Sequence, residues 1–129
     1  MTFDWADFLR LARILLESPD SPELEESCFR SATSRAYYAA YHRALERAYQ
    51  EGYQPLPGDE HKSLQRYFTQ YKPTSDTRRK IAVELSRLRD HRRQADYDSE
   101  LRSQPRSLAY YAIQMADSVL ESVARLRTE

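Results

Sequence analysis

Three side chains that bind anions or move protons fall at positions where a helical core is normally apolar. A stripe that starts at Leu24 and steps alternately by four and three residues reaches Arg35 and His42, which places them two turns apart on one helix face. The apolar stripe of residues 81–88 likewise continues into Arg92. Because a buried guanidinium is costly without a partner, these arginines need Asp96, a tyrosine hydroxyl, a ligand phosphate or an opening to solvent. The pattern predicts an interior groove that the two arginines and the histidine share.

A purely structural interpretation explains the same residues. Arg35 and Arg92 could form an internal network with Asp96 and the hydroxyls of Tyr38 or Tyr97, which would fix helix register without any ligand. His42 alone is more often a satisfied core histidine than a catalyst.

The sequence argues against a zinc site and gives no reason to expect another cofactor. The three histidines lie on separate predicted helices, and none has a second histidine or a cysteine three or four residues away. The chain has two glycines, too few for a glycine-rich phosphate-binding loop.

The elements that must position these residues are helices. Valine and isoleucine together number six, too few for a sheet-based core. Six prolines divide the chain into five helical segments, at about 3–17, 22–51, 59–71, 75–98 and 105 to nearly the end. Expected caps are Ser21 before the second segment, Gly52 after it, and Thr74 or Ser75 before the fourth. Short connections favour an all-α, up-and-down bundle of four to five helices that forms one domain over 1–129.

Composition narrows the class of protein further. The 129 residues include 20 Lys+Arg and 20 Asp+Glu, which excludes a globally basic nucleic-acid coat. One cysteine and no long apolar run favour a cytoplasmic protein without a membrane segment. Charge is uneven locally, because residues 78–93 hold seven bases against two acids, a net of +5. That stripe could hold a phosphate backbone, or the acidic first 28 residues could neutralise it.

Two segments resemble the HEPN family, small helical domains named for higher eukaryotes and prokaryotes and for their association with nucleotide binding. Residues 34–42, SRAYYAAYH, are similar to the family's S-R-x-Y-Y-A-x-[FY]-H stretch, and residues 92–97, RRQADY, to its R-x-x-A-D-Y element. Residues 60–68 look like the histidine-led third helix, and the likeness extends over roughly residues 5–125. The resemblance implies a four- or five-helix bundle, commonly a homodimer, that acts on RNA or nucleotides in toxin–antitoxin or defence systems.

Many members of that family are metal-independent ribonucleases with an R-x4-6-H motif, and Arg35 and His42 have this spacing. The resemblance implies that Arg35 would hold the scissile phosphate while His42 moves a proton at the ribose 2′-hydroxyl or the leaving oxygen. In catalytic members the motif usually lies late in the chain with a polar residue after the arginine, whereas Arg35 is early and precedes Ala36. The alternative is a noncatalytic module that partners a separate nucleotidyltransferase or antitoxin.

We therefore expect a homodimer that binds nucleotide or RNA phosphate in a cleft between the second and fourth helices. The candidate catalytic residues are Arg35 and His42. The candidate phosphate- or nucleotide-binding residues are Arg35, Tyr38, His61, Arg89, Arg92, Asp96 and Tyr97.

Overall fold

The computed structural model describes residues 2–17 and 22–126, and this part of the chain is helical without strands. Its elements are α1 (Ala6–Glu17), the 3₁₀ turn η1 (Pro22–Leu24), α2 (Glu25–Gln50), α3 (Glu60–Gln70), α4 (Asp76–Tyr97) and α5 (Pro105–Arg125). The all-α prediction is confirmed.

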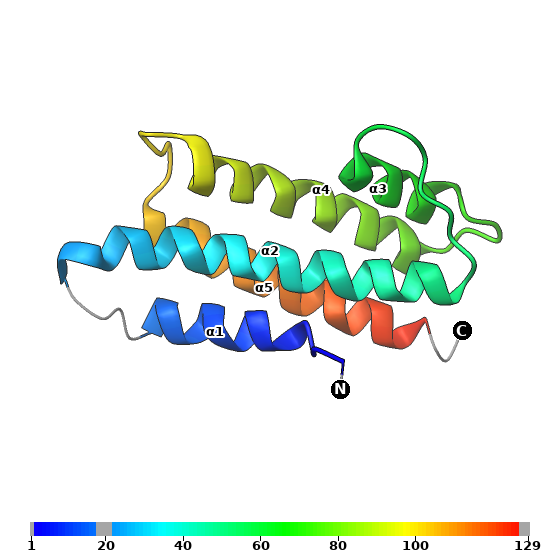
Figure 1. Cartoon of the computed structure of the whole chain (residues 1–129), viewed down its shortest axis with the longest axis horizontal. Coiled ribbons are helices and arrows are strands. Elements are labelled where there is room, and N and C mark those ends of the chain that lie inside the picture. Colours follow the sequence, from blue (N-terminus) through cyan, green and yellow to red (C-terminus); the bar gives the residue numbers. More distant parts are fainter. Residues whose placement is uncertain (1, 18–21, 127–129) are drawn as a thin grey trace.

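The long helix α2 lies at the centre of the bundle and packs on α1, α4 and α5 (Figure 1). The chain runs in alternating directions through α1, α2, α4 and α5, while short α3 packs on α4 near one end of the bundle. This arrangement brings the middle of α2 against the C-terminal half of α4, where the candidate residues lie.

Local signals account for most helix ends. The Asp59 side chain caps α3 by accepting from the backbone N–H groups of His61 and Lys62, at 2.9 and 3.2 Å. Ser75, not Thr74, caps α4 by accepting from the Arg78 N–H. Gly52, with a φ of 92°, follows the end of α2, a backbone conformation that glycine adopts without steric cost. The second helix was predicted to start at 22, but residues 22–24 form the 3₁₀ turn η1 and α2 begins at Glu25, after Leu24, which makes no side-chain capping hydrogen bond. The predicted cap Ser21 lies outside the described residues.

The first helix starts three residues later than predicted. The Asp4 side chain accepts a hydrogen bond from the Ala6 N–H at 3.0 Å, so α1 begins at Ala6 and Trp5 lies in the preceding turn. Phe3, Trp5 and Phe8 pack their rings together beside the start of this helix.

The core face of α2 differs from the predicted stripe. Besides Tyr37, its buried side is made mainly of fully buried small residues, namely Ala32, Ala36, Ala39, Ala40, Ala44 and Ala48. Arg35 and His42 are half-buried at the border of this face, so the prediction that both point into the interior is corrected. The physical reason is that alanines allow α1 and α5 to approach α2 closely, so small residues occupy the centre of the contact. Arg92, by contrast, is 8% exposed, as its core-type position predicts.

Candidate phosphate-binding site

Two arginines from different helices approach the ring of Tyr38. The guanidinium carbon of Arg35, on α2, lies 5.4 Å from the Tyr38 ring centroid and 4.6 Å from that of Phe8. The guanidinium carbon of Arg92, on α4, lies 5.7 Å from the same Tyr38 centroid. His42 lies one turn further along α2, with its ring centroid 6.2 Å from that of Tyr38. We refer to Arg35, Tyr38, His42 and Arg92 as the Tyr38 cluster.

The two arginines differ in how their charge is compensated. Arg92 Nη1 pairs with Asp96 Oδ2 at 3.6 Å, and Ser34 Oγ donates to the same oxygen at 3.3 Å. Arg35 forms no ion pair or hydrogen bond with another residue that the structure describes, although its guanidinium packs on two rings. Arg92 Nε is buried without a partner among the described residues. Of the internal network expected from the sequence, the structure contains the pair of Arg92 with Asp96. Ser34, and not Tyr38 or Tyr97, supplies the hydroxyl, and Arg35 is left out.

A basic hollow lies next to Arg92 on α4. It has a volume of about 520 Å³ and is lined by Arg89, Arg92, Arg93, Gln94, Tyr97 and Asp98. Arg89 Nη2 pairs with Asp59 Oδ2 at 2.8 Å, which ties α4 to the start of α3. The Tyr97 side chain, 74% exposed, lies with its centroid 5.8 Å from the Arg92 guanidinium carbon. Asp59 and Asp96 pair with two of the lining arginines, so Arg93 is the lining arginine without an ion pair among the described residues.

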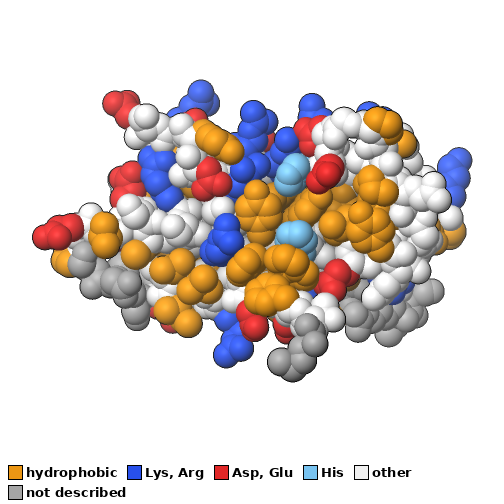
Figure 2. Space-filling view, viewed as in Figure 1, with side chains coloured by type: hydrophobic (Ala, Val, Ile, Leu, Met, Phe, Trp, Pro, Cys, Tyr) orange, Lys and Arg blue, Asp and Glu red, His pale blue; other side chains and the backbone are white. Residues whose placement is uncertain are grey.

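His42 and His61 lie near one another on an aromatic surface. The His42 ring stacks on the Trp5 indole with a centroid distance of 3.6 Å, and the Tyr37 hydroxyl hydrogen-bonds His61 Nδ1. Tyr41 contacts both imidazoles, at centroid distances of 5.2 and 4.7 Å. Figure 2 shows histidine side chains within a patch of hydrophobic side chains over α1, α2 and α3, with basic side chains beside it.

Burial keeps both imidazoles neutral at physiological pH. Desolvation, followed by repulsion from His61, lowers the pKa of His42 below 6.5. Desolvation, followed by the positive charge of Arg89, lowers the pKa of His61. Burial also raises the pKa of Tyr37 far above 10, so its hydroxyl stays protonated and can donate to His61 Nδ1. With that donation, the ring proton of neutral His61 lies on Nε2.

The predicted site residues therefore form three neighbouring groups. Arg35, Tyr38, Arg92 and Asp96 belong together, and Arg89 and Tyr97 line the adjoining hollow. His61, on α3, contacts Tyr37 and Tyr41 of α2 and therefore lies beside the cluster.

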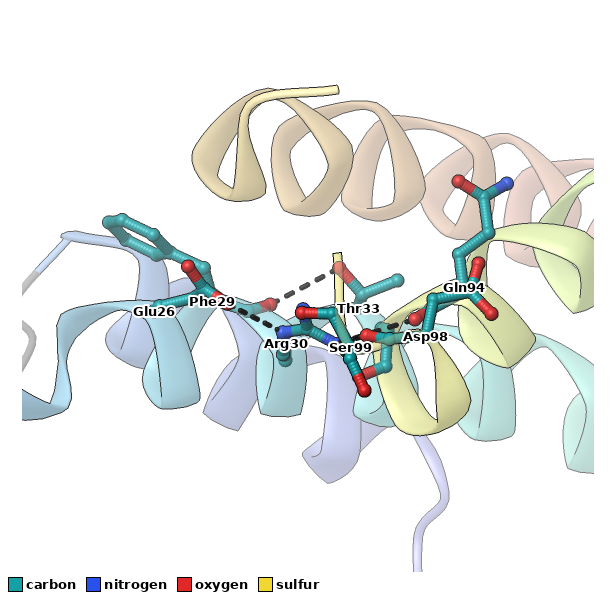
Figure 3. A network of polar contacts seen from close by, with 8 residues as sticks. Glu26, Phe29, Arg30, Thr33, Gln94, Asp98 and Ser99 are labelled. Carbon is teal, nitrogen blue, oxygen red and sulfur yellow. Dashed lines mark hydrogen bonds and ion pairs between the residues drawn. The ribbon is translucent and has the colours of Figure 1, made fainter. Parts of the chain in front are cut away.

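Arg30 is an important positioning residue that the sequence reasoning missed. Its guanidinium donates to the backbone carbonyls of Ala95 at 3.0 Å and Asp98 at 2.6 Å, with longer contacts of 3.4 Å to those of Gln94 and Ser99 (Figure 3). Helix α4 has no glycine after Tyr97, so its last carbonyls need other donors. Arg30 thereby fixes the end of α4 against α2, one turn beyond Arg92. The missing glycine is the sequence signal that could have prompted a search for such a donor.

Within the described ranges, no group of histidine, cysteine and carboxylate side chains could hold a metal ion. The same part of the chain holds no helix with the length and apolar character needed to cross a bilayer. Comparisons with models of protein families, with curated proteins and with solved structures found no match.

Proposed function

We propose that the Tyr38 cluster binds the phosphate group of a nucleotide or of RNA. The observation that carries this proposal is the approach of Arg35 and Arg92, from two helices, to within 5.4 and 5.7 Å of one tyrosine ring, with Arg35 lacking an anionic partner among the described residues. A planar guanidinium can hold two phosphate oxygens at once. Two such groups around one ring form a site for a phosphate close to an aromatic surface.

The charge balance supports the same ligand. Asp96 compensates Arg92, His42 is neutral, and Arg35 leaves the cluster with one uncompensated positive charge. The basic hollow beside Arg92 adds Arg93, which has no ion pair among the described residues, so a longer RNA could place a second phosphate there. Binding should therefore weaken as salt rises, because phosphate contacts release counterions.

Fluorescence anisotropy with a labelled single-stranded RNA tests the proposal. Arg35→Gln and Arg92→Gln should each weaken binding by about tenfold to a hundredfold, since each removes charge-assisted hydrogen bonds of about 1.5–3 kcal/mol. Arg10→Gln is the matched control, because Arg10 has a 78% exposed side chain that pairs with Asp7 on α1. Absence of saturable binding by the native protein, or equal losses in all three variants, would refute phosphate recognition at this cluster.

A second candidate function is metal-independent ribonuclease activity at Arg35 and His42. The observation that favours it is a neutral, half-buried imidazole that lies on the same helix as Arg35 and forms no hydrogen bond with another described residue. Such a ring can accept the proton of a ribose 2′-hydroxyl while Arg35 holds the phosphate. Incubation of the RNA in chelator with native protein and with His42→Gln distinguishes the functions. Cleavage that His42→Gln abolishes supports catalysis, whereas intact RNA supports binding alone.

We also propose membership of the HEPN family. Support comes from the contact between the two segments that carry the resemblance, since Ser34 donates to Asp96 and Arg92 lies beside Tyr38. The homodimer and the toxin–antitoxin partner that the family suggests remain part of this proposal. A protein that binds no RNA or nucleotide but co-purifies with a nucleotidyltransferase would favour the interaction module instead.

A further inference from the structure

A second cluster of arginines lies at the opposite end of α4 from the Tyr38 cluster. The Glu51 carboxylate at the end of α2 accepts from Arg47 Nε at 3.0 Å, from the Tyr67 hydroxyl at 2.7 Å, and from Arg78 Nη2. Arg78 belongs to the first turn of α4, fourteen residues before Arg92, which corresponds to about 21 Å along the helix. The two clusters are therefore separate.

The charges in this second cluster do not balance. Burial alone would raise the pKa of Glu51, but its hydrogen bonds with Tyr67, Arg78 and Arg47 outweigh burial and lower it, so the carboxylate is ionised. One negative charge then faces the two positive charges of Arg47 and Arg78. Because charges shielded from water are costly when uncompensated, one positive charge is available for an anion.

One hydrogen-bond donor of the Arg78 guanidinium has no acceptor among the described residues. Its side chain is only 6% exposed, and its guanidinium lies 3.7 Å from the centroid of the Tyr71 ring. Nη2 pairs with Glu51, whereas Nη1 is buried and has no partner among the described residues. Most buried guanidinium donors in folded proteins have an acceptor, so Nη1 has the capacity for one more hydrogen bond.

A cavity of about 470 Å³ adjoins this side chain. Its lining is Arg47, Glu51, Tyr71, Pro73, Thr74, Ser75, Arg78 and Leu126. Ser75 is the N-cap of α4, so the positive end of the helix dipole also faces this region. The acid in the first turn of α4, Asp76, pairs with Arg79 and does not line the cavity.

We infer that this cavity binds a small oxyanion, a phosphate or carboxylate group, held by Arg47 and Arg78 at the N-terminal end of α4. Such a ligand would accept a hydrogen bond from Arg78 Nη1, and its negative charge would neutralise the excess positive charge of the two arginines. The site is independent of the Tyr38 cluster and does not require the proposed function to be correct.

Nuclear magnetic resonance of the whole chain tests the inference through the Nε–Hε signals of Arg47 and Arg78. Sodium phosphate and sodium acetate are titrated separately, with sodium chloride keeping the ionic strength constant. We expect a saturable shift of these two signals with at least one probe. A saturable shift with phosphate indicates a phosphate site, and one with acetate indicates a carboxylate site. No saturable shift with either probe, or saturable shifts confined to the Tyr38 cluster, would overturn the inference.

Variants locate the site without depending on one substitution. Arg78→Gln should weaken binding at least about tenfold, whereas Arg79→Gln removes an equal charge from the same turn and should leave affinity unchanged. In case Arg78→Gln fails to fold, Thr74→Glu supplies a carboxylate from the cavity wall and should abolish the response, while neutral Thr74→Gln should keep it. Equal responses in Thr74→Glu and Thr74→Gln would contradict an oxyanion site in this cavity.

Discussion

Substitution of Arg30 by alanine should destabilise the protein far more than an exposed arginine normally would. The side chain is 19% exposed and has short hydrogen bonds to the carbonyls of Ala95 and Asp98, in addition to its pair with Glu26. A hydrogen bond from a charged donor contributes about 1.5–3 kcal/mol. Water can replace the donor at the exposed Asp98 carbonyl, and the Glu26 pair contributes under about 0.5 kcal/mol. The expected loss is therefore about 2–3 kcal/mol.

Urea denaturation followed by circular dichroism measures this loss, and the dependence of the unfolding free energy on urea should stay unchanged. The corresponding fall in Tm is about 10 °C for a chain of this length. Hydrogen exchange at the amides of residues 94–98 should accelerate more than exchange in the middle of α2, because the end of α4 loses its donor.

Two further variants separate the carbonyl contacts from charge. Glu26→Gln removes only the i,i+4 pair with Arg30 and should cost less than about 0.5 kcal/mol. Arg30→Lys keeps a positive charge near the end of α4 but cannot span several carbonyls, so an intermediate loss is expected. If Arg30→Ala destabilises no more than Glu26→Gln, the carbonyl contacts do not hold α4 in place.

Three other predictions concern the aromatic surface. The folded-state pKa values of His42 and His61 lie below 6.5, so the unfolded chain binds more protons at mildly acidic pH. The contribution of the two histidines to stability is complete above about pH 6.5 and declines as the pH falls below that value. Urea denaturation should therefore give a lower unfolding free energy at about pH 5.5 than at about pH 7.5. An equal or higher unfolding free energy at the lower pH would contradict this prediction. Trp5, the only tryptophan, stacks on His42, so its fluorescence should fall with a midpoint below 6.5 as His42 is protonated, and a titration that persists in His42→Gln would show another cause. Tyr37→Phe removes the hydroxyl bound to His61 Nδ1 and should cost about 1 kcal/mol in urea denaturation, whereas unchanged stability would show that this hydrogen bond makes no net contribution.

Most helix boundaries were predictable because their signals are local, whereas the starts of α1 and α2 were predicted three residues too early. Prolines, the Asp59 and Ser75 side chains, and Gly52 each act within a few residues of the helix end that they define. The orientation of α2 was less predictable. The predicted core stripe, which begins at Leu24, passes through Arg35 and His42 and leaves out the alanines that form the buried face. The fully buried alanines show that close helix approach, which depends on several neighbouring helices at once, decided which face is inward.

The candidate site shows the same division between local and distant information. The pair of Arg92 with Asp96 follows from their i,i+4 spacing, and the structure contains it. The stacking of His42 on Trp5 and the contacts of Arg30 with the end of α4 join residues far apart in the chain. No spacing rule within one helix could have predicted these contacts.

Isothermal titration calorimetry with adenosine 5′-monophosphate and with adenosine tests phosphate recognition at the Tyr38 cluster most directly, because the two ligands differ only in the phosphate. The nucleotide should bind saturably, at least about tenfold more tightly than the nucleoside, and more weakly at about 200 mM salt than at about 50 mM. The double variant Arg35→Gln, Arg92→Gln should bind both ligands alike. Equal affinity of the native protein for the two ligands, or no binding of either, would contradict phosphate recognition by these arginines.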